Sequence, residues 1–368
     1  MIMSKVEEIF NKAKKIHQSG QIKEAQLLYK KLITHVRNNF QLFFLLGTSY
    51  LQTKNYSEAI NYLETSIKLN PSFENAYNNI GIALAEKKNY QRAIYNYNKA
   101  LELKPNFFDA LLNKGIALKN IHQYENANKF LNLAKSINPE KPEIYNSLGN
   151  VFKEQAYYDK AIKSYDIAIK MNSQYVDAYN NKGVVLNLMG KFEESFQNYE
   201  MALSINPNTD YFLSGIIHSK MHLCDWRNLE NLIFKLEKNI LNKNHIADPF
   251  ILLSLIDNLK IQKINSENHI KKKFQEYKSS NIKLNKLQNN QKIKIGYFSG
   301  EFHSHPCLLL MKDVYKNHNK SNFEIYAFSY GPNPKTNPWR DVVKPYFKTF
   351  FDVSKKSDEE ITNLSDEL

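Results

Sequence analysis

Small and large apolar positions recur with a step of 34 residues through the first 209 positions of the chain. A small residue recurs at Ala13, Gly47, Gly81, Gly115, Gly149 and Gly183, and a second one at Ala25, Ala59, Ala93, Ala127, Ala161 and Ser195. A large residue, aromatic or aliphatic, recurs at Tyr29, Leu63, Tyr97, Leu131, Tyr165 and Tyr199. Proline follows at Pro71, Pro105, Pro139 and Pro207, with Ser173 in its place once. Four registers that hold over this many periods indicate an internal repeat.

Each unit of this repeat is predicted to be a pair of helices, because its apolar residues follow helical spacing. The small residue of the first helix lets the second approach closely, and proline then ends the unit because it cannot continue a helix. One pair cannot bury its own apolar face, so the pairs are expected to stack into a superhelix with a concave face. The pattern resembles the tetratricopeptide (TPR) family over about residues 6–209. We therefore expect residues 1–209 to be an α-solenoid of about six TPR repeats.

A row of polar residues is expected on the concave face of this solenoid. Its members stand two positions before the small residue of the first helix, a position that faces the groove in TPR arrays; they are Asn79, Asn113, Ser147 and Asn181. Asparagine amides in such a row could hydrogen-bond the backbone of an extended polypeptide without reading its side chains. Ser147 interrupts the row, and Leu45 takes the position in an earlier repeat. The alternative is a set of solvated asparagines in an Asn-rich chain.

The repeat register is lost from Tyr211, and residues 210–291 are expected to form a helical junction with a polar, Lys- and Asn-rich end. His218 and His222 are four residues apart, which puts them on one helical face at metal-ligand spacing, with Cys224 close by. No second cluster supplies further ligands. Packing at the junction is therefore favoured over a metal site.

From Lys292 onward, strand-like and helix-like segments alternate. Strand patterns at 292–298, 323–331 and 347–353 are separated by helical patterns at 307–316 and 339–346, and Ser357 is a candidate N-cap for a last helix. This alternation predicts a parallel, Rossmann-like sheet, so residues 292–368 are expected to be the first part of an α/β lobe. No G-x-G-x-x-G follows the first strand, so a dinucleotide fingerprint is absent.

Three sequence segments resemble protein O-GlcNAc transferases of the bacterial, TPR-containing kind, including the SPINDLY-like proteins. They are MHLCDW at 221–226, PFILLSLID at 249–257 and IGYFSGEFHSHPCLLLM at 295–311. In the last, Ser299 and Phe302 match the family's Ser-x-Asp-Phe motif with Glu301 in place of Asp. His305 matches the family's active-site histidine, and Leu309 stands where some relatives have a second one.

The resemblance implies a hexosyltransferase that moves GlcNAc from UDP-GlcNAc to Ser or Thr of a polypeptide held in the TPR groove, with no cofactor and no metal. It also implies that His305 is a site residue, acting as a base or by positioning a substrate. Two alternatives rest on the residues alone. One is a loop histidine that caps the following helix, and the other is a weak metal pair of His303 with His305.

Composition narrows the possible partners and the compartment. The formal charge is +13, but arginine, the residue suited to bidentate phosphate and base contacts, occurs only four times, so a solvated lysine surface is favoured over nucleic-acid binding. Two distant cysteines, no signal-peptide pattern and no long apolar run indicate a cytoplasmic protein that does not bind a membrane. Self-association through the repeats is a further expectation.

The chain is expected to stop within the first lobe of a two-lobed transferase. The resemblance assigns most donor contacts to the second lobe, so these 368 residues are expected to be inactive on their own. The competing hypothesis is a TPR scaffold that binds proteins and performs no chemistry.

Overall fold

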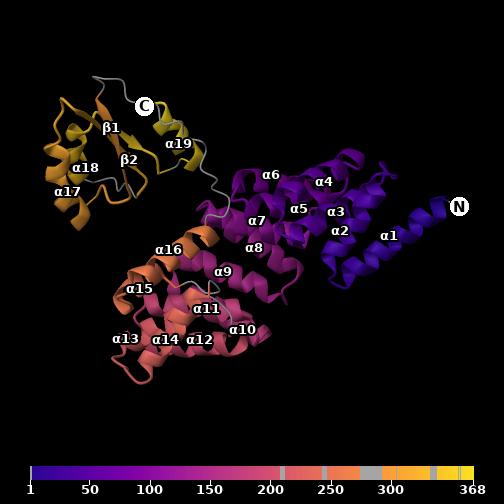
Figure 1. The fold of residues 1–368 in the computed structure, drawn as a ribbon, viewed down its shortest axis with the longest axis horizontal. Helices are drawn as coiled ribbons and strands as arrows, with labels where there is room; N and C mark the ends of the chain where they lie inside the picture. The colour runs from indigo at the N-terminus through magenta and orange to yellow at the C-terminus, as the bar shows by residue number, and fades with distance from the viewer. Residues whose placement is uncertain are drawn as a thin grey trace. The chain divides into compact units, whose positions relative to one another are not determined.

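The computed structural model describes residues 2–207, 212–242, 247–273, 292–303, 305–331, 338–354, 356 and 358–368. The polar end of the predicted junction, at 274–291, and the candidate cap Ser357 lie outside these ranges. The chain divides into two compact units, Met1–Lys278 and Ser279–Leu368 (Figure 1). The finer division of the first unit at residue 209 stays a prediction.

The first unit confirms the predicted stack of six helix pairs (Figure 1). The pairs are α1 (Ile2–Gln18) with α2 (Ile22–Ile33), α3 (Phe40–Gln52) with α4 (Tyr56–Leu69), α5 (Glu74–Glu86) with α6 (Tyr90–Leu103), α7 (Phe108–Asn120) with α8 (Tyr124–Ile137), α9 (Pro142–Glu154) with α10 (Tyr158–Met171), and α11 (Val176–Leu188) with α12 (Phe192–Ile205). The first helices of successive pairs contact one another from α3 to α11, so they form one continuous row.

Close approach within each pair depends on the repeated glycine. A Cβ added at Gly115 would lie 2.7 Å from Leu131 Cγ, and one added at Gly183 would lie 3.1 Å from the Tyr199 ring. The same contact joins Gly47 to Leu63, Gly81 to Tyr97 and Gly149 to Tyr165. All five large partners are buried. The small residues and the large residues that recur in the sequence are therefore the two partners in one helix–helix contact.

The turn inside each pair carries a register that the sequence hides. One residue per turn has a positive φ, and these residues recur every 34 positions; they are Gly20, Lys54, Lys88, His122, Ala156 and Gly190. In the second pair, the N–H of Asn55 donates to Tyr50 O (2.9 Å) and the N–H of Lys54 to Leu51 O (3.0 Å). These bonds close the helix end with a left-handed residue, for which glycine is the usual choice.

Further helices follow the repeats and complete the first unit. They are α13 (Phe212–His222), α14 (Leu229–Leu241), α15 (Pro249–Leu255) and α16 (Leu259–Lys273). Helix α13 packs on α12, where a Cβ added at Gly215 would lie 2.8 Å from the Tyr199 ring. Ile217, Leu236, Ile240 and Leu252 form the buried core of these helices. No helix in the described ranges is long and apolar enough to cross a membrane.

The second unit contains the predicted parallel sheet, in the order β1 (Ile293–Ser299), β2 (Phe323–Ser329), β3 (Thr349–Asp352). Helices α17 (Pro306–Lys316) and α18 (Pro338–Val343), followed by the 3-10 turn η1 (Lys344–Tyr346), lie on one side of the sheet, and α19 (Asp358–Asp366) lies on the other (Figure 1). Each face has its own apolar core, around Phe302 and Phe347 on one side and around Tyr326 and Phe328 on the other. Strand ends differ from prediction by one or two residues, because the ladder pairing decides where a strand stops.

Candidate functional site

The asparagine row is tied together by hydrogen bonds between neighbouring repeats. Asn113 Nδ2 donates to Asn78 Oδ1 (3.2 Å) and Asn181 Nδ2 donates to Asn146 Oδ1 (2.9 Å). Asn79 Nδ2 donates in the same way to Thr48 Oγ1 of the preceding repeat (3.0 Å). One amide N–H of each predicted asparagine is therefore used within the solenoid. Its carbonyl oxygen and its second N–H are the groups left to meet a bound backbone.

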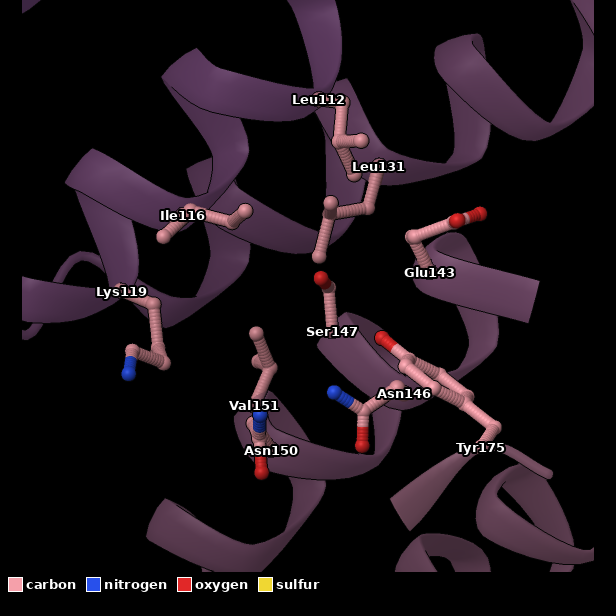
Figure 2. Close-up of a pocket in the computed structure, with 10 residues that line it drawn as sticks. All are labelled: Leu112, Ile116, Lys119, Leu131, Glu143, Asn146, Ser147, Asn150, Val151 and Tyr175. Carbon is pink, nitrogen blue, oxygen red and sulfur yellow. The ribbon is translucent and has the colours of Figure 1, made fainter. Parts of the chain in front are cut away.

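The row is interrupted between the repeats of α7 and α9. Ser147 occupies the asparagine position of α9, and Leu112 stands where Asn78 and Asn146 provide acceptors in other repeats. Among the described residues, Ser147 makes no hydrogen bond to the preceding repeat. A pocket of about 280 Å³ opens at this junction, lined on its apolar side by Leu112, Ile116, Leu131 and Val151 (Figure 2). Figure 2 shows the Ser147 hydroxyl directed toward Leu112 and Leu131.

Polar groups surround this pocket. Asn146, Asn150 and Tyr175 lie on one side of the opening, and Lys119 and Glu143 stand on opposite sides (Figure 2). Burial lowers the pKa of Lys119. Burial raises the pKa of Tyr175 to about 12, although a hydrogen bond with Asn146 acts in the opposite direction and lowers it. Sequence reasoning named Ser147 but missed Asn146, Asn150 and Tyr175. Asn146 directly precedes Ser147, so a comparison of the next position along the repeat, in steps of 34 residues, would have found it.

In the second unit, the candidate loop begins where β1 ends. Ser299 Oγ accepts the backbone N–H of Glu301 (2.9 Å), which turns the chain away from the sheet. Phe302 is buried and its ring contacts Phe347 and Phe350, so it anchors the middle of the loop. Gly331, just after β2, approaches the backbone of Gly300 so closely that it has no room for a Cβ. The loop is therefore fixed at its start and at Phe302.

His305 lies at the end of this loop and is the N-cap of α17. Its Nδ1 accepts the backbone N–H of Cys307 (3.2 Å), and Pro306 takes the first helical position, where a missing N–H costs nothing. The capping alternative from the sequence therefore describes its contact correctly. The side chain is still 39% exposed, so capping does not remove it from solvent.

Glu301 competes for the same nitrogen of His305. Glu301 Oε2 lies 3.0 Å from His305 Nδ1 and 3.6 Å from His303 Nε2. Nδ1 cannot accept the Cys307 N–H and donate to a carboxylate at once, because a neutral imidazole nitrogen is either an acceptor or a donor. In the capped arrangement the ring proton is on Nε2, which then donates. In the Glu301-paired arrangement the proton is on Nδ1, and Nε2 accepts.

The carboxyl ends of all three strands meet beside this loop, as parallel strands require. Ser299, Ser329 and Asp352 are aligned across β1, β2 and β3. Asp352 accepts a hydrogen bond from Arg340 Nη1 (3.2 Å), and bonds from Ser354 and Arg340 hold the pKa of its carboxyl below the usual range. Arg340 is buried, and its guanidinium also lies 5.0 Å over the Phe350 ring.

The histidines of α13 pack against an aromatic ring. His222 stacks on Phe192 with ring centroids 4.1 Å apart, and the Nε2 atoms of His222 and His218 are 3.2 Å apart. Burial, and then the neighbouring His222, lowers the pKa of His218. Cys224 is exposed in the following turn with a positive φ. Within the described ranges, no group of three or more His, Cys, Asp or Glu residues is placed to hold a metal ion.

Comparison with protein families defines the class of each part. Residues 224–362 match the model of glycosyl transferase family 41, and tetratricopeptide-repeat models match residues 19–107, 96–127, 142–175 and 176–209. The chain thus joins a region that matches TPR models to a region that matches the family 41 glycosyltransferase model. Among solved structures, a TPR protein from Parabacteroides merdae covers 72% of this chain and 98% of its own (TM-score 0.54, 15% identity). A match to the Cut9–Hcn1 hetero-tetramer of the APC/C covers 70% of this chain and 48% of the matched chain (TM-score 0.54, 16% identity). At such identities these likenesses show the fold alone.

Two curated relatives are peptide N-acetylglucosaminyltransferases. The probable UDP-N-acetylglucosamine–peptide N-acetylglucosaminyltransferase SEC of Arabidopsis thaliana is 32% identical over 74 residues, 20% of this chain and 8% of its own. The UDP-N-acetylglucosamine–peptide N-acetylglucosaminyltransferase of Caenorhabditis elegans is 32% identical over 69 residues, 19% of this chain and 6% of its own. The matched stretches thus cover less than a tenth of either relative.

Proposed function

We propose that this chain belongs to a protein O-GlcNAc transferase. The TPR row binds the polypeptide acceptor, and the family 41 segment takes part in transfer of GlcNAc from UDP-GlcNAc to Ser or Thr. The observation that carries this proposal is the union in one chain of TPR repeats with a family 41 segment whose loop holds an accessible His305. A non-catalytic scaffold is not favoured, since nothing in that role calls for such a segment.

His305 is proposed as the residue that meets the acceptor or the sugar. Its loop follows β1 at the carboxyl edge of the sheet, where ligands of open α/β sheets bind. When Glu301 holds the Nδ1 proton, Nε2 can take the proton of an acceptor hydroxyl, which is general-base chemistry. When His305 caps α17, Nε2–H can only donate, which positions a substrate oxygen. Neither route calls for a cofactor or a metal, and we propose that none is used.

The test of this catalytic role is transfer of radiolabelled GlcNAc. The 368 residues alone are expected to transfer no sugar, because the resemblance assigns the diphosphate contacts to a second lobe. Joined to a donor-binding lobe of family 41, the chain should become active. His305→Ala should then lower turnover by about 100-fold or more. His303→Ala, on the same loop and also near Glu301, is the matched control and should do much less. Equal turnover of wild type and His305→Ala would remove His305 from the site.

The proposed acceptor groove has a separate test. Replacing Asn79, Asn113 and Asn181 with Ala should weaken binding of an unstructured polypeptide, measured by calorimetry, while far-UV circular dichroism stays unchanged. The asparagines then act on the ligand and not only between repeats. Equal affinity of wild type and triple variant would leave these residues with a purely structural role.

Compartment and assembly complete the proposal. Cys224 and Cys307 are free and exposed, which fits a reducing compartment such as the cytoplasm. Exposed apolar residues end four successive second helices, at Leu69, Leu103, Ile137 and Met171. We propose that this repeated surface supports self-association, and sedimentation of Ile137→Lys beside the wild type would test it. An unchanged molar mass would exclude Ile137 from any contact between copies.

A further inference from the structure

The interruption of the asparagine row and the pocket coincide at one repeat junction. At three other junctions an amide of one repeat reaches an oxygen of the preceding one, at Asn79, Asn113 and Asn181. At the junction of α7 and α9, serine replaces the donor and Leu112 replaces the acceptor. Because both substitutions occur together, the two helices are not bridged there, and the space between them is apolar.

The size and charge of the pocket select its occupant. A volume of about 280 Å³ is ample for one aliphatic side chain but small for a folded element. Leu112, Ile116 and Val151 provide apolar walls. Lys119 and Glu143 stand on opposite sides of the opening, one of each charge, so the pocket favours neither sign of ligand. Burial already disfavours the charged form of Lys119. At the opening, Asn146 Oδ1 already accepts Asn181 Nδ2 (2.9 Å) and Asn150 Oδ1 accepts the Tyr165 hydroxyl (2.9 Å). The Asn150 Nδ2 group remains to donate to the backbone beside the inserted side chain.

We propose that this pocket binds one aliphatic side chain of the polypeptide that lies along the row. The pocket adds sequence selectivity to a groove that otherwise contacts only the backbone. The inference rests on the proposed function, in which the row binds a polypeptide. It deepens that function by specifying the acceptor as a segment with a leucine-like residue at one fixed place. Burying such a side chain strengthens binding, whereas alanine leaves the walls unfilled and lysine brings a charge into apolar surroundings.

The experiment uses short fluorescein-labelled peptides of Gly, Ser and Thr with a single central Leu, Ala or Lys. Their affinities for the full chain are measured by fluorescence anisotropy up to millimolar protein. The Leu peptide should bind about 10-fold more tightly than the Ala or Lys peptide. Ser147→Leu places an aliphatic side chain in the pocket from the protein itself and should reduce that preference to less than about twofold. Asn79→Ser, at the equivalent position of another repeat, is the matched control: it should weaken binding of the Leu and Ala peptides alike and so keep their ratio.

A second variant keeps the proposal open to refutation if Ser147→Leu fails to fold. Leu112→Ala enlarges the pocket and should move the preference from Leu toward a Phe peptide. Equal binding of Leu and Ala peptides by the wild type overturns the pocket, and so does a Leu preference that survives Ser147→Leu. If those peptides bind equally but the Asn79, Asn113 and Asn181 triple variant binds neither, the groove stands without the pocket. If no peptide binds, both fail.

Discussion

Substituting Gly115 tests the contact on which the whole repeat array depends. A Cβ at this position would lie 2.7 Å from Leu131 Cγ and 2.8 Å from its Cδ2, whereas carbon atoms in contact rest about 3.5–4.0 Å apart. The overlap of about 1 Å falls on a side chain that is fully buried, so it cannot swing into solvent. Gly115→Leu gains less than about 1 kcal/mol of helix propensity. It loses more by forcing α7 from α8, and we expect a net destabilisation of about 2–4 kcal/mol.

Urea unfolding followed by far-UV circular dichroism measures this loss. Gly183→Leu is the matched control, because its Cβ would lie 3.1 Å from the Tyr199 ring and should cost less. Leu131→Ala should destabilise the wild type through a cavity, but in the Gly115→Leu background it should restore part of the stability. An unchanged midpoint for Gly115→Leu, or strictly additive effects in the double variant, would refute the contact described here.

Three further predictions address the turn, the loop and α13. His122→Gly should raise the free energy of unfolding by about 1 kcal/mol, since His122 has a φ of 60° that glycine adopts freely; a lowered urea midpoint would contradict this. Glu301→Gln should change the ¹⁵N shifts of the His305 ring toward the tautomer with its proton on Nε2, and identical spectra would show that Glu301 does not hold that proton. Purified protein should contain no zinc at His218, His222 and Cys224, and one equivalent by elemental analysis, lost in His222→Ala, would show a metal site.

The repeat and the sheet can be predicted from the sequence because both require particular side-chain sizes and polarities at regular positions. Gly149 and Tyr165 must keep a fixed spacing along the chain, since a larger residue in place of Gly149 would clash with the Tyr165 ring. Proline is a weaker signal: α10 ends at Met171, two residues before Ser173, where α8 ends at Ile137, two residues before Pro139. Backbone hydrogen bonding closes these helices alike, with proline or without it.

Other features stay hidden from the sequence because they depend on contacts between elements. The positive φ of Lys88 follows from the backbone bonds of its turn, and no residue type signals it. The pocket forms because both members of a hydrogen-bonded pair are missing: Ser147 replaces the asparagine that donates, and Leu112 replaces the residue that accepts. The contact between Glu301 and His305 depends on the path of a loop anchored by Phe302. Pattern reasoning placed His305 in that loop but left its partner unnamed.

The locality of the contacts in the helix pairs has a consequence for folding. Gly115 meets Leu131 sixteen positions along the chain, and the bond from Asn113 to Asn78 spans 35 positions. Chains rich in such short-range contacts fold fast, because little loop entropy is lost before a contact forms. A ribosome adds one 34-residue unit in about 2–7 s, far longer than a helix pair needs to form. Each repeat can therefore fold on the preceding one as it emerges, so that the array assembles in order from its N-terminus. The sheet can form only later, once its strands have been synthesised.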